Sequence, residues 1–446
     1  MRCTVVGAGP VGTLMALMLA RRGWMVRVIE RRADPRTAAP EHGRSINLAL
    51  AARGLRALQQ AGLAARIAPL MVAMPGRMLH DERSQLQFLP YGQNEREIIY
   101  AISREQLGRT LIEAAAGEPA IELRFDLRCT GLDPRTARLQ LLDERTGASG
   151  EEPFDIVLAA DGAGSAVRGA LAAHGYSRVR EQPLPHDYKE LTIAAQPGAA
   201  WAFEPHALHI WPRGGYMLIA LPNTDGSFTA TLFLSRHGKP GFDRLADGAA
   251  ARALFERELP DAAARLPDLE QQFIEHPQGQ LGTVYCDGWQ AEGRVLLLGD
   301  AAHAIVPFHG QGLNCGFEDC SALDRLLQTQ PPAEALALFE RERRPNSDAI
   351  AAMALENYVE MRDGVRSEQF APRKQLAGQL ERAFAGRFIP RYSMVMFHPE
   401  IPYAEAQRRG AHQQRLLDAL IERFGYGAPS PDALGYAREL LDAAGL

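Results

Sequence analysis

Residues 3–12 read CTVVGAGPVG, and this stretch decides the fold. The apolar run Cys3–Val6 has the length and composition of a short buried strand. A glycine turn follows, and the residues from Thr13 to Arg22 then suit a helix that Gly23 ends. A second strand is expected at 25–30. Because strand, turn, helix and strand in this order form a βαβ unit, the sequence predicts an α/β fold with a Rossmann-like domain built on a parallel sheet.

The glycines of this turn have the GxGxxG spacing of a dinucleotide-binding site. Gly7 permits the tight turn, Gly9 lets the backbone approach a pyrophosphate, and Gly12 lets the helix pack against the strand. Glu30 ends the second strand, where a carboxylate takes the ribose hydroxyls of an ADP moiety. The alternative is a glycine turn in an ordinary α/β domain, but strand, helix and acid together favour a nucleotide site.

Two later segments indicate FAD rather than NAD as the cofactor. Asp161-Gly162 looks like the DG motif of FAD-dependent hydroxylases, and Gly299-Asp300 looks like their GD motif, whose aspartate bonds the ribityl chain. A glycine-containing loop then leads into a helix whose positive N-terminal end would face the flavin. The residues predicted at the cofactor from these motifs are Gly7, Gly9, Val11, Gly12, Glu30, Arg31, Asp161, Asp300, Gly312, Leu313 and Asn314.

Between these motifs the hydrophobic pattern changes. Apolar residues recur at every second position on either side of a turn at 223–226, which predicts an antiparallel sheet. The segment Gly76–Glu97 is polar and is predicted to be irregular, and the chain is mostly helical after about residue 331. We therefore expect an FAD-binding domain split over 1–75, 101–180 and 281–330, a substrate-binding β-sheet domain at 76–100 and 181–280, and a C-terminal helical region at 331–446.

Almost the whole chain resembles the kynurenine 3-monooxygenases, a family of single-component FAD-dependent aromatic hydroxylases. Segments beyond the flavin motifs carry the resemblance, among them GRSINLAL (43–50), PYG (90–92), DYKEL (187–191), LHIWP (208–212), ENYVEM (356–361) and FIPRYSMV (388–395). The resemblance implies the aromatic hydroxylase fold, bound FAD, and NADPH and O2 as co-substrates. It also implies hydroxylation of L-kynurenine to 3-hydroxy-L-kynurenine through a flavin C4a-hydroperoxide, in tryptophan degradation.

The resemblance further implies a substrate site. Arg77 and Tyr91 fall on the arginine and tyrosine with which the family holds the amino-acid carboxylate, and Asn357 and Tyr392 complete the site. A planar guanidinium and a phenol suit a carboxylate. For the aromatic end of the substrate an apolar slot is expected, although such a stripe is more often plain core; its candidates are Leu208, Ile210, Met217, Ile219, Leu221, Thr231, Phe233 and Phe308. Near the cofactor we also expect Arg44, Ala49, Arg104 and Cys129.

No side chain is identified as catalytic from the sequence. The loop that contains Pro307, Phe308, His309 and Gln311 is expected to face the flavin. We interpret His303 and His309 as hydrogen-bonded pocket residues rather than general bases, because no partner carboxylate is visible in the sequence. The ring of kynurenine is already activated by its own amine, so the chemistry does not require a strong base.

Composition excludes several other classes of protein. A net charge of −5 and a pI near 6.2 leave no basic footprint for nucleic acid. The five scattered cysteines match no metal-ligand pattern and fit a reducing cytoplasm, so no metal is expected. Since no window of about 18 apolar residues is present, no membrane anchor is expected. The expected partner is the small-molecule substrate, and the chain is expected to be a monomer or a homodimer.

Three alternatives stay open at this point. A hydroxylase of the same type could act on another aromatic acid, although the residues at 77, 91, 357 and 392 favour an amino-acid clamp. A flavin-binding regulatory protein would hold FAD without consuming NADPH. A flavin reductase or halogenase is the third, but a halogenase needs a lysine near the flavin. The three lysines are Lys189, Lys239 and Lys374, none beside the GD motif in sequence.

Overall fold

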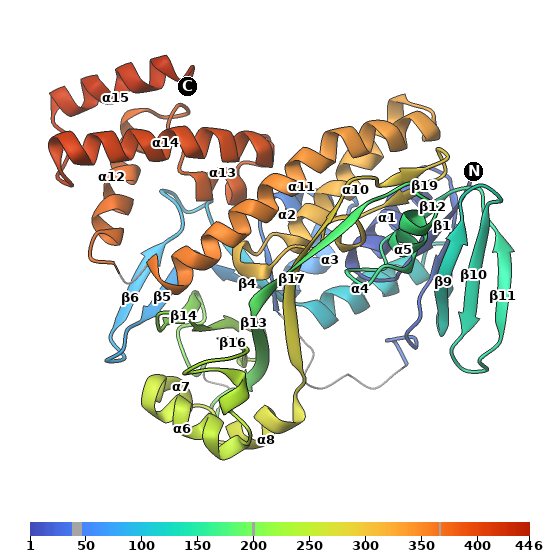
Figure 1. Cartoon of the computed structure of the whole chain (residues 1–446), viewed down its shortest axis with the longest axis horizontal. Helices are drawn as coiled ribbons and strands as arrows, with labels where there is room; N and C mark the ends of the chain where they lie inside the picture. Colours follow the sequence, from blue (N-terminus) through green and yellow to red (C-terminus); the bar gives the residue numbers. More distant parts are fainter. Residues whose placement is uncertain (38–46, 199–200, 365–366) are drawn as a thin grey trace.

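The computed structural model describes residues 1–37, 47–198, 201–364 and 367–446. Two large sheets dominate it (Figure 1). The sheet that contains the N-terminal strand lies towards the right of this view, and the second sheet occupies the centre and the lower left. Helices from the C-terminal part of the chain form a further layer at the upper left.

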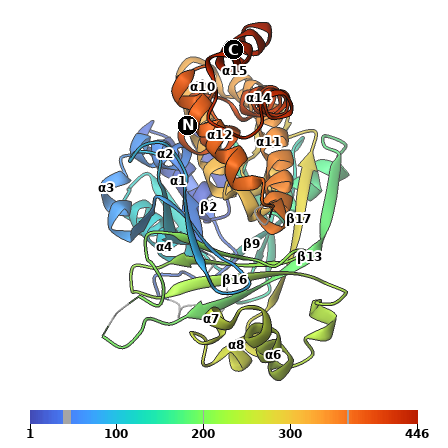
Figure 2. The ribbon, with the colours of Figure 1, turned by 90° about the vertical axis from the view of Figure 1, so that its left-hand side faces the viewer.

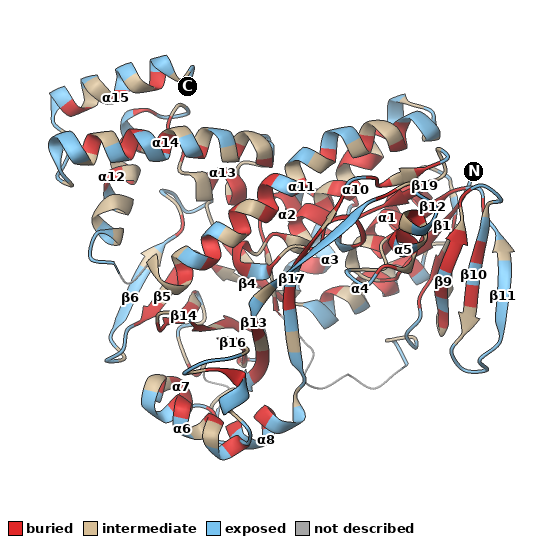
Figure 3. Ribbon diagram, viewed as in Figure 1, coloured by how far each residue is buried: buried red, intermediate tan, exposed pale blue. Residues whose placement is uncertain are grey.

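The first sheet has six strands in the order β18-β19-β12-β1-β2-β8. Its strands are β1 (Arg2–Val6), β2 (Met25–Ile29), β8 (Ile121–Arg124), β12 (Val157–Ala159), β18 (Gln290–Ala291) and β19 (Val295–Leu297). All neighbouring pairs are parallel except β18 with β19. The central strands β1, β12 and β19 are buried almost throughout (Figure 3), as in a parallel sheet covered by helices.

Several helices contribute to the hydrophobic core of this sheet, among them α1 (Pro10–Arg21), α4 (Arg104–Ala116), α5 (Ala166–Ala173) and α10 (Gly312–Thr329). The predicted βαβ unit of β1, α1 and β2 is confirmed. The helix begins at Pro10, earlier than expected, because proline is well tolerated in the first turn of a helix.

The second sheet has seven strands in the order β17-β13-β16-β15-β14-β5-β6. They are β5 (Gly76–His80), β6 (Leu86–Pro90), β13 (Val179–Ile193), β14 (Leu208–Pro212), β15 (Met217–Pro222), β16 (Phe228–Ser235) and β17 (Gln278–Cys286). All pairs are antiparallel except β14 with β5. The prediction of an irregular segment at Gly76–Glu97 is wrong. That segment holds the edge hairpin β5–β6, whose outer strand β6 is exposed and whose inner strand β5 pairs with distant β14.

The two faces of the second sheet have different partners. One face packs on α6 (Gly248–Glu258), α7 (Pro260–Ala263) and α8 (Leu269–Glu275), which lie below the sheet in Figure 2. Trp211, Phe228 and Phe255 are fully buried between them. Because side chains alternate along a strand, the intervening residues point to the opposite face, which lies towards the first sheet.

Two three-stranded sheets accompany the two large ones. One three-stranded sheet consists of β3 (Asn47–Leu50), β7 (Ile99–Ser103) and β4 (Met71–Met74), and another of β9 (Leu127–Asp133), β10 (Arg138–Asp143) and β11 (Ser149–Pro153). The helical segment between β3 and β4 is divided into α2 (Ala52–Gln60), α3 (Ala64–Ile67) and the short turn η1 (Ala68–Leu70). The division falls at Gly62, whose φ of +63° cannot continue a helix.

The chain is helical after residue 331, as predicted. The helices are α11 (Pro332–Arg362), α12 (Phe370–Ala383), α13 (Arg391–Phe397), α14 (Tyr403–Phe424) and α15 (Pro431–Ala443). The long helix α11 contacts both α10 and α14, so it joins the C-terminal layer to the first sheet. Within the described ranges, no helix is both long enough and apolar enough to pass through a membrane.

Replacing Phe228 with alanine should destabilise the protein by about 3–5 kcal/mol, because the ring is fully buried between β16 and the helices α6–α8. Denaturant unfolding measures the loss. Phe88→Ala is the matched control, since that ring is 44% exposed on the edge strand β6, and its free energy of unfolding should change by no more than about 0.5 kcal/mol. Equal losses in both variants would contradict the assignment of this core.

Candidate functional site

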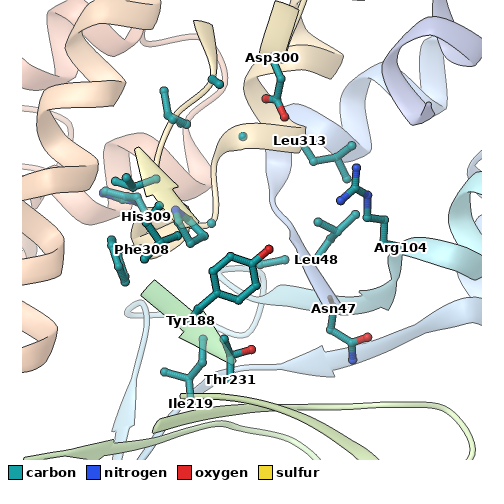
Figure 4. Close-up of a pocket in the computed structure, with 18 of the residues that line it drawn as sticks. Asn47, Leu48, Arg104, Tyr188, Ile219, Thr231, Asp300, Phe308, His309 and Leu313 are labelled. Atoms are coloured by element: carbon teal, nitrogen blue, oxygen red, sulfur yellow. The ribbon is translucent and has the colours of Figure 1, made fainter. Parts of the chain in front are cut away.

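A cavity of about 430 Å³ lies between the two large sheets, a size that suits a small-molecule site. Its wall combines segments far apart in sequence: the turn before α1, strand β3, the second sheet, and the segment that joins β19 to α10. In Figure 4, Asp300 and Leu313 lie at one end, Ile219 and Thr231 of the second sheet lie at the other, and Tyr188 lies between them.

The glycine turn has no room for side chains at two of its positions. A Cβ on Gly12 would lie 2.0 Å from the carbonyl oxygen of Gly7, and one on Gly7 would lie 2.5 Å from that of Ala160. Beside Gly9, in contrast, the space is open, and Gly9 and Val11 line the cavity. The N-terminus of α1 therefore faces an open space, which fits the pyrophosphate of FAD.

Glu30 holds this turn from the end of β2. One oxygen of its buried carboxylate accepts a hydrogen bond from the Ala8 N–H at 2.9 Å, and the other accepts two from Arg32. Burial alone would raise the pKa of Glu30, but Arg32 outweighs it and holds the pKa below its ordinary value. Neither Glu30 nor the exposed Arg31 lines the cavity, so their contact with an ADP moiety stays a prediction.

Two carboxylates follow strands of the first sheet. Oδ2 of Asp161 accepts hydrogen bonds from Ala166 and Val167 at the start of α5, while its buried Oδ1 has no partner among the described residues. Asp300 faces the cavity directly, and no described residue donates a hydrogen bond to its carboxylate. Burial raises the pKa of both groups. The carboxylate of Asp300 at this end fits the hydroxyl-rich ribityl chain of FAD, whereas Asp161 does not line the cavity.

The loop after α9 (Asp300–His303) contains a short turn, η3 (Pro307–His309), whose three residues line the cavity. The Phe308 ring stacks on the Tyr358 ring with centroids 3.9 Å apart, and Asn357 Nδ2 donates to the Phe308 carbonyl at 2.6 Å. Burial lowers the pKa of His309 to about 3, so its ring is neutral at ordinary pH. Helix α11 thus fixes the loop from behind.

The side chain of Gln311 does not face the cavity, which corrects its assignment to the flavin face. Gln311 is fully buried, and its Oε1 accepts a hydrogen bond from the Tyr403 hydroxyl at 2.7 Å. This partner belongs to α14, far along the chain, and no local pattern indicates it. Helix α14 of the C-terminal layer therefore contacts the loop through Gln311, which was expected from the sequence to face the flavin.

Asn314 also points away from the cavity and joins two parts of its wall. Its Oδ1 accepts a hydrogen bond from the Ala51 N–H at 2.9 Å, and its Nδ2 donates to the carbonyls of Ala49 and Gly310, both at 2.8 Å. Ala49, Gly312 and Leu313 line the cavity. Asn314 thus supports residues predicted at the cofactor without lining the cavity itself.

The expectation that His303 lacks a partner carboxylate is wrong. Its Nε2 lies 2.6 Å from Oδ2 of Asp319, which belongs to α10, and both residues are buried outside the cavity wall. The ligand atoms of His303, Cys315 and Asp319 all lie within 4.8 Å of one another, as in a metal site. Asp319 is, however, already bonded to His303 and to Arg343, so we assign the cluster to an ionic network.

Arg77, Tyr91 and Tyr392 meet where the cavity adjoins a smaller one of about 260 Å³. The guanidinium carbon of Arg77 lies 5.4 Å from the ring centre of Tyr91 and 4.8 Å from that of Tyr392, and the two rings stack with centroids 5.5 Å apart. Arg77 is only 6% exposed. Neither its Nε nor the Tyr91 hydroxyl has a hydrogen-bond partner in the described part of the chain.

The apolar slot is formed mainly by the face of the second sheet that points away from α6–α8. Its residues that line the cavity are Leu208, Met217, Ile219, Leu221, Thr231 and Phe233. Ile210 does not line it, which corrects that assignment, because it is enclosed by Leu79, Met217 and Phe233 in the core. Ile210 is therefore an ordinary residue of the hydrophobic core and not part of the slot.

Some lining residues were not singled out from the sequence. They are Asn47, Leu48, Ile99, Tyr188, Gln280, Leu281, Met361 and Met396. Asn47, Leu48, Tyr188 and Met361 belong to the quoted segments GRSINLAL, DYKEL and ENYVEM, so a signal was present for them. The others come from elements whose approach to the cavity depends on long-range pairing.

Of three further residues predicted near the cofactor, one lines the cavity, one does not, and one lies outside the described residues. Arg104 begins α4 and lines the cavity (Figure 4). Cys129 of β9 is buried and does not line it, and its thiol donates to the Gly131 carbonyl at 3.4 Å. Arg44 lies outside the residues that the structure describes.

Known proteins match this chain over nearly its whole length. A family model described as an FAD binding domain matches residues 1–354. The kynurenine 3-monooxygenase of Myxococcus xanthus (strain DK1622) is 45% identical over 436 residues, which cover 98% of this chain and 93% of that protein. The kynurenine 3-monooxygenase of Xanthomonas axonopodis pv. citri (strain 306) is 46% identical over 415 residues, 93% of this chain and 91% of that protein.

Solved structures share the fold at lower identity. 2-Methyl-3-hydroxypyridine-5-carboxylic acid oxygenase has a TM-score of 0.67 and 19% identity, with 83% of this chain and 95% of that chain covered. p-Nitrophenol 4-monooxygenase from Pseudomonas putida DLL-E4 has a TM-score of 0.65 and 18% identity, with 85% and 93% covered. Likeness at this identity concerns the fold alone, and it confirms the aromatic hydroxylase fold predicted from the sequence.

Gly12→Ala should weaken FAD binding at least about tenfold, because strain of roughly 1.4 kcal/mol suffices for that and the added methyl would lie 2.0 Å from the Gly7 carbonyl oxygen. Flavin absorbance per mole of purified protein and a fluorescence titration measure it. The control is Gly435→Ala in α15, where a Cβ meets no atom within 4 Å and binding should not change. Normal FAD content in the Gly12 variant would refute the close approach.

Proposed function

The chain belongs to the kynurenine 3-monooxygenase family of FAD-binding proteins, and from this premise we propose that it hydroxylates L-kynurenine to 3-hydroxy-L-kynurenine with NADPH and O2. One observation carries the substrate assignment: Arg77 is a buried cation with an unused donor in the cavity wall. A buried cation of this kind needs an anionic partner. The α-carboxylate of an amino acid supplies one.

Electron uptake from NADPH and activation of O2 are the chemistry that bound FAD supplies. The chain's own part is to hold the cofactor. Gly9 and the N-terminus of α1 would hold the pyrophosphate, and Asp300 would accept hydrogen bonds from the ribityl hydroxyls. The N-terminal end of α10 opens into the cavity at Gly312 and Leu313, where its partial positive charge would stabilise negative charge on bound flavin.

The substrate would be held at both its ends. Arg77 can donate two parallel hydrogen bonds to a carboxylate, and the Tyr91 hydroxyl adds a third donor. Asn357 lines the cavity and stays a candidate for contact with the substrate, and its amide donates to the Phe308 carbonyl, which fixes the ring-facing loop. The apolar residues of the second sheet would hold the aromatic ring and exclude water from it.

The reaction does not require the protein to supply a strong general base. The amine of kynurenine already activates the ring position ortho to it, so positioning and exclusion of water are the main tasks. His309 has a neutral ring at the cavity wall and can exchange a hydrogen bond there without a change of charge. Halogenase chemistry is disfavoured because none of the three lysines lines the cavity.

We also propose the division into an FAD-binding domain at 1–75, 101–180 and 281–330, a substrate domain at 76–100 and 181–280, and a helical region at 331–446. The composition of the two large sheets supports it. A cytoplasmic location is likewise a proposal. It is supported by the five cysteines, which are all buried and free of disulfides, as in proteins of reducing compartments.

The direct test measures NADPH oxidation by the FAD-loaded protein with and without L-kynurenine, and identifies the product by mass and retention time. Strong stimulation together with 3-hydroxykynurenine is the expected result. Stimulated oxidation that yields only peroxide would transfer the assignment to another aromatic acid. Bound FAD without stimulated oxidation would favour a protein that binds flavin but does not turn over.

Arg77→Ala should weaken kynurenine binding by a factor on the order of 10–100 and leave FAD content normal, because a hydrogen bond to a charged group contributes about 1.5–3 kcal/mol. The change in flavin absorbance on titration with kynurenine gives the dissociation constant. The matched control is Arg83→Ala, an exposed arginine in the β5–β6 turn, which should bind kynurenine normally. Unchanged affinity in the Arg77 variant would remove the carboxylate role.

A further inference from the structure

A row of charged side chains, all buried except the half-buried Glu318, lies behind the turn that carries Asp300, and none of its members lines the cavity. In order, it consists of His303, Asp319, Arg343, Glu318 and Arg53. His303 Nε2 lies 2.6 Å from Asp319 Oδ2, and Arg343 bridges Asp319 and Glu318 with two contacts of 2.7 Å. Glu318 also pairs with Arg53. The signs alternate, so each buried charge has an opposite neighbour.

Asp319 ties this row to the GD turn. Its fully buried carboxylate accepts hydrogen bonds from His303, from Arg343 and, at 3.0 Å, from the backbone N–H of Gly299. Gly299 directly precedes Asp300, whose carboxylate faces the cavity. A displacement of Asp319 would therefore move the backbone segment that holds Asp300 at the cavity.

His303 is the member of the row whose side chain ordinarily changes its charge near neutral pH. Burial alone would lower the pKa of His303, but the adjacent Asp319 outweighs it, and the pKa lies well above its ordinary value. The other titratable groups around the ring are Cys315, whose Sγ lies 4.0 Å from Nδ1, and the carboxyls of Asp300 and Asp348. With His303 protonated, the row has three cations and two anions, and so one net positive charge.

This charge lies near the flavin end of the cavity. His303 is the last residue of α9, a single turn that begins with Asp300. The N-terminal end of α10 reaches the same end of the cavity at Gly312 and Leu313. Because water screens a buried charge only weakly, its effect extends over several ångströms.

We propose that His303 is a positioning residue of the cofactor site, and that its buried positive charge, fixed by Asp319 behind the Gly299-Asp300 turn, favours the reduced over the oxidised form of bound FAD. Two-electron reduction adds negative charge to the flavin ring system, and a fixed cation nearby stabilises that charge. The inference rests on the FAD site and is independent of which aromatic acid is hydroxylated.

His303→Gln tests the charge, because the glutamine amide can still donate to Asp319 but is neutral. In the FAD-loaded variant, the equilibrium should shift at least tenfold towards oxidised flavin, which is about 30 mV for a two-electron couple. Anaerobic dye equilibration without substrate measures the midpoint potential, so a wrong substrate assignment would not affect the result. An unchanged potential in a variant that retains FAD overturns the proposal.

His209→Gln is the matched control. His209 is as deeply buried, but it lies on the helix-covered face of the second sheet, where it contacts His80 and the Glu204 carbonyl. Its replacement should leave the flavin potential unchanged. An equal fall in both variants would indicate general loosening of the protein and would also overturn the proposal.

A second measurement uses the unaltered holoenzyme and does not depend on the variant's folding. In protein labelled with ¹⁵N-histidine, the ring nitrogens report protonation by NMR. At about pH 8, where an ordinary histidine is neutral, at least one of the 12 histidines should retain both ring protons. A spectrum in which every histidine is neutral would show that His303 carries no charge and would overturn the proposal.

Discussion

The side chain of Asn314 joins strand β3 to the turn at Gly310, and the relative position of these two segments of the cavity wall depends on its hydrogen bonds. Its one acceptor and two donors bind strand β3 on one side and the turn at Gly310 on the other. A buried amide left without partners costs about 1–3 kcal/mol, so the three bonds favour a single arrangement of turn and strand. Ala49 and Gly312 line the cavity because of this arrangement.

The two kinds of buried cation in this protein are compensated in different ways. The row from His303 to Arg53 is an internal network in which carboxylates separate the cations. Arg77 instead lies against the faces of two tyrosine rings, which attract a cation without neutralising it. The first arrangement suits a permanent structural charge, and the second suits a charge that meets its counterion in a ligand.

Local signals predicted the local parts of the fold. The turn at Gly7–Gly12 depends on neighbours in sequence, since a Cβ on Gly12 would meet the Gly7 carbonyl, and it could be predicted closely. The hairpin β5–β6 could not, because its inner strand pairs with β14, far along the chain. The partners of His303 and Gln311 were missed for the same reason, since α10 and α14 bring them near only after folding.

The parallel pairing of β5 with β14 puts Arg77 directly opposite Leu208, so the cation proposed to hold the carboxylate and an apolar residue proposed to hold the ring belong to adjacent strands of one sheet. Their spacing is a property of backbone hydrogen bonds and not of side chains. If Arg77 binds the substrate carboxylate as proposed, this fixed spacing would determine which ring carbon lies at the reactive position. Exchange of slot residues changes the ring shape accepted, whereas the length would change only with a slip of register, which would turn Arg77 to the opposite face.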